Sequence, residues 1–235
     1  MIDVHSHLVF GVDDGSKTIE ESVEILKGLY EMGVTDTIIT PHYINETIYI
    51  SPKLENLKKI VKIKEELLKQ NINVNLYLGN EVYIDKDISK CVKENKICTL
   101  NNTEYILIEL PMSGIYPDYL DIFLGLINEG FKVVLAHPER YTAFQKDFNK
   151  IYELSEIGVL FQCNLGSILG EYGKEATKVI KRLLKEKLVY MIGTDIHHPK
   201  KKYDMLKKAT KKYKKYLNDE EIEDILKNNA KKILN

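Results

Sequence analysis

Residues 132–141 have the sequence KVVLAHPERY. Lys132–Ala136 predicts a buried β-strand, and a histidine, a glutamate and an arginine follow where that strand ends. A helical pattern separates each expected strand from the next, which is typical of parallel β-α-β units with the helices outside. The other expected strands are Ile2–Val4, Asp36–Thr40, Asn75–Gly79, Tyr105–Leu110, Val159–Cys163 and Val189–Gly193.

Start and stop signals mark several of the helical segments. Asn218 followed by Glu221 resembles a capping box, and Ser51-Pro52 puts a capping residue before a proline at the first helical position. Glycines stand where three helices should end: Gly33, Gly130 and Gly158. The expected helices are Ile19–Met32, Pro52–Gln70, Asp87–Glu94, Tyr119–Glu129, Phe148–Ile157, Lys174–Glu186, Asp204–Tyr216 and Asp219–Leu234. No repeat or flexible linker divides this series, so we expect one domain over residues 1–235.

The overall composition excludes several classes of protein. The 34 Lys and Arg residues nearly balance the 35 Asp and Glu residues, and this balance gives no general attraction to nucleic acid. We find no signal peptide and no apolar run that approaches the length of a membrane span. Cys91, Cys98 and Cys163 form no CxxC pair, which predicts neither a disulfide framework nor a zinc ribbon and fits a reducing cytoplasm.

Six of the seven expected strands end in a histidine or a carboxylate. The ends are His5-Ser6-His7, Thr40-Pro41-His42, Gly79-Asn80-Glu81, Ile108-Glu109, Ala136-His137-Pro138-Glu139-Arg140 and Thr194-Asp195-Ile196-His197. In a parallel barrel these ends converge on one face. A His-x-His pair alone is weak support for a metal site, but Glu109 and Asp195 follow apolar runs where an unpaired carboxylate is costly. We therefore expect positive charge to meet them.

Imidazoles and carboxylates without thiolates favour Mn²⁺, Fe²⁺ or Zn²⁺. The strand ends offer more of these groups than one ion needs, so we expect a cluster of two or three ions with Glu81 as a candidate bridge. Closely spaced metals stabilise the attacking and the leaving oxygen of a phosphoryl transfer and lower the pKa of a bound water. The pattern therefore predicts a hydrolase.

The same residues resemble the polymerase-and-histidinol-phosphatase (PHP) superfamily, and more narrowly its bacterial protein-tyrosine phosphatases of capsule and exopolysaccharide synthesis, the CpsB/CapC type. The resemblance spans essentially the whole chain. It rests on the strand-end motifs above, on Gly11-Val12-Asp13-Asp14-Gly15 and on His137-Pro138-Glu139-Arg140-Tyr141. It implies a distorted seven-stranded (β/α) barrel of the PHP kind, with a trinuclear centre that typically contains manganese.

The resemblance also implies a role for individual residues. It would place His5, His7, Glu81 and Asp195 on one metal, Glu81, Glu109 and His137 on a second, and Asp14, His42 and His197 on a third. Arg140 corresponds to an arginine that contacts the phosphate. Many relatives carry another arginine soon after the Asp-x-His motif, whereas this chain has Lys200, Lys201 and Lys202, which would bind phosphate only as point charges.

By the same resemblance, a metal-bound hydroxide would attack a phosphomonoester directly. The substrate would be the phosphotyrosine tail of a membrane-associated bacterial tyrosine kinase. The chain lacks the Cys-x₅-Arg loop of cysteine-dependent tyrosine phosphatases. Tyrosines that follow strand ends are candidates to line a pocket for an aromatic ring: Tyr43, Tyr83, Tyr116 and Tyr141.

Four alternatives remain open on the sequence. Two are enzymes with the same metal site, a small-molecule phosphatase of the histidinol-phosphatase type and a PHP phosphodiesterase that acts on nucleic acid. A third is an amidohydrolase, whose usual carboxylated lysine has no counterpart at these strand ends. The fourth is a catalytically silent scaffold that docks on a kinase, which a complete set of ligands disfavours.

Overall fold

The computed structural model describes residues 1–50, 52–200 and 203–235, and in these ranges strands and helices alternate along the chain. The strands are β1 (Ile2–Asp3), β2 (Asp36–Ile39), β3 (His42–Tyr43), β4 (Asn75–Leu78), β5 (Glu81–Tyr83), β6 (Tyr105–Glu109), β7 (Lys132–Ala136), β8 (Leu160–Asn164) and β9 (Val189–Gly193). The α-helices are α1 (Ile19–Glu31), α2 (Lys53–Lys69), α3 (Ile88–Lys93), α4 (Tyr119–Asn128), α5 (Thr142–Lys146), α6 (Asn149–Glu156), α7 (Gly173–Lys185), α8 (Met205–Tyr213), α9 (Asp219–Glu223) and α10 (Asn229–Leu234).

All strand pairs are parallel, in the orders β1-β2-β4 and β3-β5-β6-β7-β8-β9. Only Thr40-Pro41 separates β2 from β3, and only Gly79-Asn80 separates β4 from β5. The short strands β3 and β5 were not predicted, and they extend the chain direction beyond the expected ends of Asp36–Thr40 and Asn75–Gly79. Pro41 has no N–H to donate to a ladder, which contributes to the first interruption. The seven expected strand positions are confirmed.

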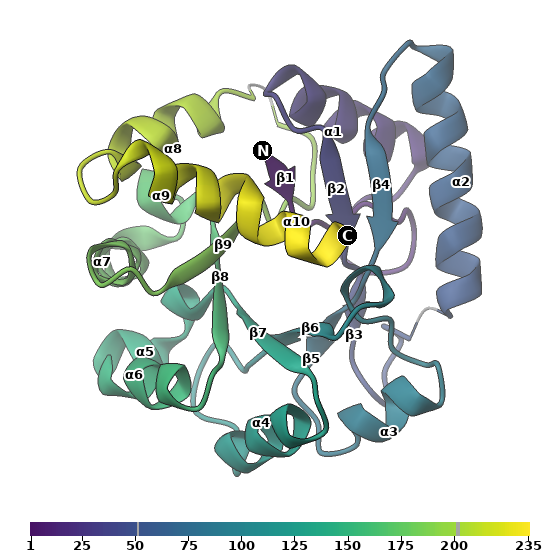
Figure 1. The fold of residues 1–235 in the computed structure, drawn as a ribbon. Coiled ribbons are helices and arrows are strands. Elements are labelled where there is room, and N and C mark those ends of the chain that lie inside the picture. The colour runs from purple at the N-terminus through teal and green to yellow at the C-terminus, as the bar shows by residue number, and fades with distance from the viewer. Residues whose placement is uncertain (51, 201–202) are drawn as a thin grey trace.

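The first strand approaches the last one at their carboxyl ends. Asp195 N donates to His5 O at 2.8 Å, and residues Ser6 and Ile196 form a parallel bridge. A Cβ on Gly193 would lie 2.7 Å from the Cβ of His5, so this approach requires glycine. The contact between first and last strands gives the distorted barrel, with the helices outside it in Figure 1.

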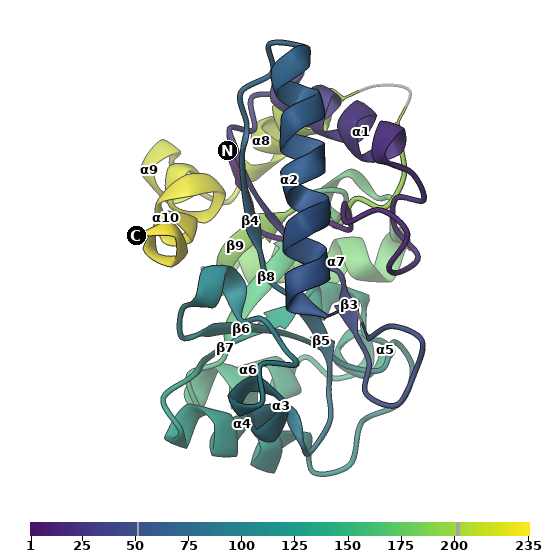
Figure 2. The same ribbon diagram turned by 90° about the vertical axis from the view of Figure 1, so that its right-hand side faces the viewer.

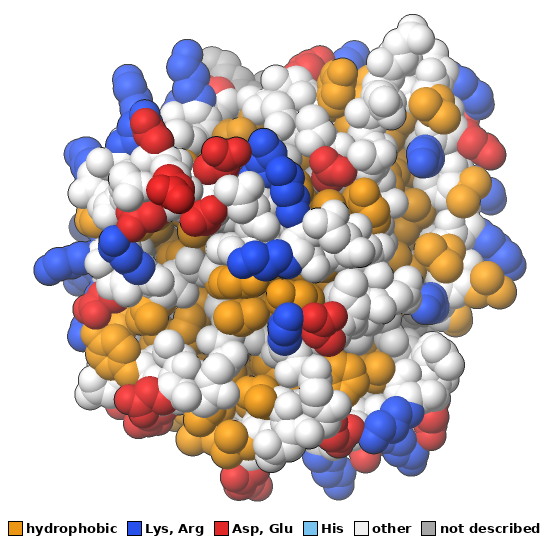
Figure 3. Space-filling view, viewed as in Figure 1, with side chains coloured by type: hydrophobic (Ala, Val, Ile, Leu, Met, Phe, Trp, Pro, Cys, Tyr) orange, Lys and Arg blue, Asp and Glu red, His pale blue; other side chains and the backbone are white. Residues whose placement is uncertain are grey.

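Helices α9 and α10, joined by a π-helical turn at Asp224–Asn228, cross the amino-terminal end of the barrel (Figure 1). Ala230 and Ile233 pack there in one apolar cluster with Ile2 and Met191. This end is closed, and Figure 3, which has the same viewpoint, has no histidine side chain in view on it.

Two helices differ from their predicted form. The chain after Asn218 was expected to be one regular helix, but a π turn forms at Asp224–Asn228. Buried Ala230 comes five positions after buried Ile225, and the wider turn keeps both on the inner side. Helix α2 begins at Lys53, one residue after the expected start, and Ser51 lies outside the described residues. The capping box at Asn218 and Glu221 is confirmed.

Helix ends at Gly33, Gly130 and Gly158 are confirmed, each glycine having a positive φ. Helix α5 was not predicted. It has only five residues and lies directly after the 3₁₀ turn Pro138–Arg140. Within the described ranges, we find no helix with the length and apolar character required to cross a bilayer.

Candidate metal centre

All nine histidines and carboxylates expected to bind metal meet at the carboxyl ends of the strands, within the described part of the chain. They are His5, His7, Asp14, His42, Glu81, Glu109, His137, Asp195 and His197. The backbone is strained at two of these positions, with φ of 32° at His137 and 52° at Asp195. Both are buried residues without a glycine's freedom, and strain of this kind typically accumulates at functional sites.

The first group surrounds one oxygen of Glu81. His5 Nε2 lies 3.2 Å and His7 Nε2 3.3 Å from Glu81 Oε2. Asp195 Oδ1 is 3.6 Å from the same His5 nitrogen and 3.5 Å from that of His7. These four side chains are buried and present their donor atoms to one another.

The second group lies on the other oxygen of the same carboxylate. His137 Nε2 is 2.9 Å from Glu81 Oε1 and 3.8 Å from Glu109 Oε1. Glu81 thus contacts one group through Oε2 and the next through Oε1. This arrangement suits a bridging carboxylate.

The third group is the most exposed. Asp14 Oδ1 is 3.5 Å from His42 Nε2 and 3.4 Å from His197 Nε2, and the rings of His7 and His197 stack with centroids 3.9 Å apart. The second nitrogen of His42, Nδ1, lies 3.2 Å from Glu81 Oε2. His42 therefore lies between the third group and the other two.

Buried negative charge dominates the electrostatics of the site. Burial, together with the neighbouring Glu81 and Asp195, raises the pKa of Glu109 to about 9. Burial opposes ionisation of Glu81 as well, but His5 and His137 hold its pKa well below the usual range. A bound cation would favour the ionised form of Glu109, which burial and the neighbouring carboxylates disfavour.

The donor set fits divalent ions. Nδ1 of His42 is buried and forms no aligned hydrogen bond, although Glu81 Oε2 lies 3.2 Å away, and the other donors of the site are carboxylate oxygens and imidazole nitrogens. In each of three overlapping groups, the donor atoms lie within 4.8 Å of one another. The groups are His7, Asp14, His42 and His197; His5, His7 and Glu81; and His42, Glu81 and Glu109. Such groups suit borderline or hard cations.

Asp13 orients the histidines of the site, a role that the sequence analysis did not assign. Its Oδ2 lies 2.8 Å from His7 Nδ1 and accepts from His42 N, and its Oδ1 accepts from Gly15 N. The contact with Nδ1 leaves His7 Nε2 to face Glu81. A Cβ on Gly15 would lie 2.2 Å from His7 O, so the Asp-Asp-Gly turn needs its glycine.

Strand β8, which ends in no histidine or carboxylate, contributes two amides that were also missed. Gln162 Oε1 lies 2.7 Å from His5 Nδ1, and Gln162 Nε2 donates to Asn164 Oδ1 at 3.0 Å. Asn164 Nδ2 in turn donates to Asp195 Oδ2 at 2.7 Å. The only sequence signal was a polar residue at alternate positions of a buried strand, Gln162 and Asn164.

Arg140 lies at the edge of this network. Its Nη1 donates to Asp195 Oδ2 at 2.7 Å, and its guanidinium lies 4.7 Å from the centroid of the Tyr172 ring. The side chain is 26% exposed, so its remaining N–H groups are accessible from outside the barrel. Glu139, which directly precedes Arg140, is buried and accepts hydrogen bonds from Asn164 N and Ser167 Oγ.

Two other expectations require correction or restriction. Tyr43 and Tyr141 are almost fully buried, and the hydroxyl of Tyr141 donates to Ala136 O, so neither offers an open surface to an aromatic ring. Tyr141 and Tyr116 border a small apolar cavity with Phe144. Lys200 forms an ion pair with Glu171 at 2.9 Å. Lys201 and Lys202 lie outside the described residues.

The chain is similar to known proteins over nearly its whole length. The family model for capsular polysaccharide synthesis proteins CpsB/CapC matches residues 1–235. CapC of Staphylococcus aureus is 34% identical over 97% of this chain and 89% of its own. The tyrosine-protein phosphatase CpsB of Streptococcus agalactiae is 32% identical over 84% and 83%.

A solved structure agrees with this result. It comes from a study of YwqE from Bacillus subtilis and CpsB from Streptococcus pneumoniae, described as metal-dependent tyrosine phosphatases. It superposes with a TM-score of 0.84 and 27% identity, over 94% of this chain and 89% of the other.

Proposed function

The chain belongs to the CpsB/CapC family and is a metal-dependent tyrosine-protein phosphatase of capsule synthesis, and from this premise we propose how its site performs the reaction and on what substrate. The observation that carries the mechanism is the sharing of Glu81 between groups of buried histidines and carboxylates, with Arg140 beside them. The substrate is the phosphotyrosine tail of a membrane-associated bacterial tyrosine kinase.

The centre would hold two or three divalent ions, with manganese as our choice and iron or zinc as the other candidates. His5, His7, Glu81 and Asp195 would hold one ion. Glu81, Glu109 and His137 would hold the second, and Asp14, His42 and His197 the third. Ions bound there would supply a hydroxide nucleophile at neutral pH and offset the charge of the phosphoryl oxygens.

Arg140 binds the phosphate. The hydrogen bond to Asp195 and the contact with the Tyr172 ring fix the plane of the guanidinium group. The free N–H groups of Arg140 donate to the phosphoryl oxygens and stabilise charge in the transition state. Asp195 therefore both holds metal and orients the arginine. This coupling explains why Asn164, which donates to the same carboxylate, belongs to the working site.

No cysteine nucleophile takes part. Cys91, Cys98 and Cys163 are free and buried. Burial raises the pKa of the Cys98 thiol, and burial together with nearby Glu139 raises that of Cys163 well above its usual value. Thiols in this state are poor nucleophiles. Three free cysteines also fit the cytoplasm, where we place the protein.

The basic segment at Lys200–Lys202 steers the phosphorylated tail toward the site. Lys200, the member of this segment that the structure describes, comes three residues after His197 of the metal centre. Replacing all three lysines by Gln should lower kcat/KM for a phosphorylated kinase tail, with the effect shrinking at high salt, and should leave hydrolysis of a small aryl phosphate nearly unchanged. Equal losses on both substrates would instead place these lysines inside the catalytic site.

A direct substrate comparison tests the proposed function. Hydrolysis of para-nitrophenyl phosphate with Mn²⁺, abolished by EDTA, would separate an enzyme from a silent scaffold. Phosphotyrosine peptide, histidinol phosphate and single-stranded DNA are then compared at equal concentration. We expect the highest kcat/KM for the peptide. A preference for histidinol phosphate or for DNA would support the small-molecule phosphatase or the phosphodiesterase instead.

A further inference from the structure

Helix α2 has an exposed apolar face in addition to its buried one. Four side chains form this outer face and are 39–64% exposed: Leu54, Leu57, Val61 and Leu68. Their spacing of three, four and seven residues follows a heptad pattern, which places them in one line along the helix. The line is about 21 Å long, at 1.5 Å per residue.

Neighbouring elements leave this outer face uncovered. Helix α2 runs down the front of the molecule in Figure 2 with no other element over it, and apolar side chains lie along the corresponding edge in Figure 3. The core side of the helix consists of other residues, Asn56, Ile60, Ile63 and Leu67. A line of apolar side chains of this length on a surface typically marks an interaction site.

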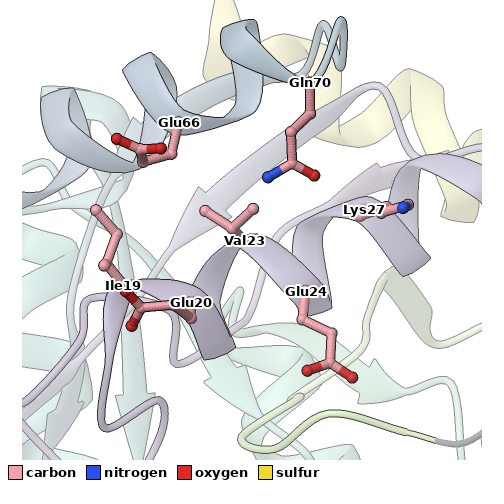
Figure 4. A pocket seen from close by; sticks show the side chains of 7 residues that line it. All are labelled: Ile19, Glu20, Val23, Glu24, Lys27, Glu66 and Gln70. Carbon is pink, nitrogen blue, oxygen red and sulfur yellow. The ribbon is translucent and has the colours of Figure 1, made fainter.

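The groove between α1 and α2 lies on a different side of the helix. It has a volume of about 440 Å³ and is lined by Glu66 of α2 and by Gln70, which directly follows α2 (Figure 4). Glu20 and Glu24 of α1 line the opposite wall. None of the four outer-face residues lines this groove, so the outer face is a separate surface.

We propose that the outer face of α2 binds the same face of a second copy of this chain, with the two helices antiparallel and crossing at Val61. Leu54 and Leu68 lie seven residues before and after Val61. A two-fold axis at Val61 therefore puts Leu54 of each copy against Leu68 of the other. An isologous contact of this kind closes as a dimer.

The charges beside the outer face favour this orientation. Lys58 and Glu65 occupy the same flank, one turn before and one turn after Val61, and the two-fold axis brings Lys58 of each copy to Glu65 of the other. A parallel pair would instead place Lys58 near Lys53 of the other copy. Like charges there would disfavour the parallel arrangement.

Both members of the pair are accessible in the single chain. Glu65 forms no ion pair with any residue that the structure describes. Lys58 pairs with Glu55 at 2.7 Å, but both side chains are more than half exposed, so this contact contributes little and is easily exchanged. The area of a single helix face is modest, which predicts a weak dimer with micromolar affinity.

Sedimentation velocity of the metal-loaded full chain, at concentrations spanning the micromolar range, tests the proposal. We expect a concentration-dependent equilibrium between monomer and dimer, and Val61→Glu should abolish the dimer. Leu124→Glu on α4 is the matched control, because Leu124 is also an exposed leucine, at 38%, on another helix. A wild-type chain that stays monomeric throughout, or a Val61→Glu chain that still dimerises, would overturn the proposal.

Charge exchange tests the orientation of the two helices. Lys58→Glu alone and Glu65→Lys alone should each weaken dimerisation by about tenfold, because each creates two like-charge contacts per dimer. The double variant should recover the wild-type affinity, since the exchange restores both pairs. A double variant as weak as either single one would rule out the antiparallel arrangement. Circular dichroism and hydrolysis of a small aryl phosphate verify that every variant is folded.

Discussion

The two ends of the barrel differ in chemistry: one is apolar and the other is charged. At the amino-terminal end, α10 packs Ala230 and Ile233 onto apolar strand residues. At the carboxyl-terminal end, buried carboxylates and imidazoles lie within hydrogen-bonding distance of one another. Apolar packing lowers the free energy of the folded chain, whereas clustered charge raises it unless a cation is bound. Stability therefore comes mainly from the amino-terminal end of the barrel, and activity from the carboxyl-terminal end.

Removing a metal ligand should produce the largest effect on activity. His5→Ala, Glu109→Ala and Asp195→Ala should each abolish phosphatase activity and leave a folded barrel, because each side chain faces the metal centre and lies away from the closed end. Activity assays, metal analysis and thermal melting measure this. His198→Ala is the control, since exposed His198 adjoins His197 without joining the donor groups.

The closed end should respond in the opposite way. Ile233→Ala should destabilise the fold by about 2–5 kcal/mol, because it leaves a cavity in a fully buried site, and should keep most of the activity below its melting temperature. If all three ligand variants retain activity with unchanged metal content, or if Ile233→Ala alone abolishes it, the contrast between the ends is wrong.

Arg140 should give the next largest effect. Arg140→Ala should lower kcat by about 10²–10³-fold with the metals still bound, because it removes donors to the phosphoryl oxygens and leaves the ligands in place. Arg140→Lys should recover only part, since a lysine lacks the planar fork. Arg182→Ala on α7 is the control for loss of an arginine. Full activity of Arg140→Lys would reduce Arg140 to a general source of positive charge.

The amides of β8 should matter less than the ligands they hold. Gln162→Leu and Asn164→Leu should each lower metal affinity or activity by about 10–100-fold, because His5 and Asp195 lose their orienting hydrogen bonds. Excess metal should restore part of the activity. Asn229→Leu removes an amide contact at the closed end, to Tyr190 O, and should leave metal affinity unchanged. Equal losses of affinity in all three variants would indicate general destabilisation.

The sequence was sufficient for the strands and for the charged residues at their ends. A buried apolar run that stops at a carboxylate, as before Glu109 or Asp195, is costly without a partner, and parallel topology predicts where such ends meet. Uncharged side chains that orient the metal ligands carry no such signal in the sequence, because their burial is less costly. Gln162 and Asn164 could equally have been ordinary polar residues of a strand, and only their distances to His5 and Asp195 reveal their role.

Other features depended on contacts that a linear pattern does not encode. The π turn before Asn229 follows from the need to keep successive buried residues against the barrel end, which the helical period alone does not predict. The burial of Tyr43 and Tyr141 likewise depends on neighbours distant in sequence. The apolar line on α2 was not singled out from the sequence, because a helical pattern does not show which side of a helix is left uncovered.

The smallest expected effect is the release of about one proton when metal binds. It tests whether repulsion between the carboxylates at the open end limits metal binding. With a pKa of about 9 in the metal-free chain, Glu109 carries a proton at pH 7. Metal binding requires the carboxylate and must displace that proton, so metal affinity should rise with pH and level off above about 9. Calorimetric titration of Mn²⁺ in buffers of different ionisation enthalpy gives the number released. Glu109→Gln should lower the number of protons released by about one. His5 and His7 should still release protons in this variant, because their pKa values are also raised. Glu81 and Asp195 raise the pKa of His5, and chiefly Asp13 raises that of His7. An unchanged number in Glu109→Gln would show that Glu109 is already ionised and that repulsion from Glu81 does not limit metal binding.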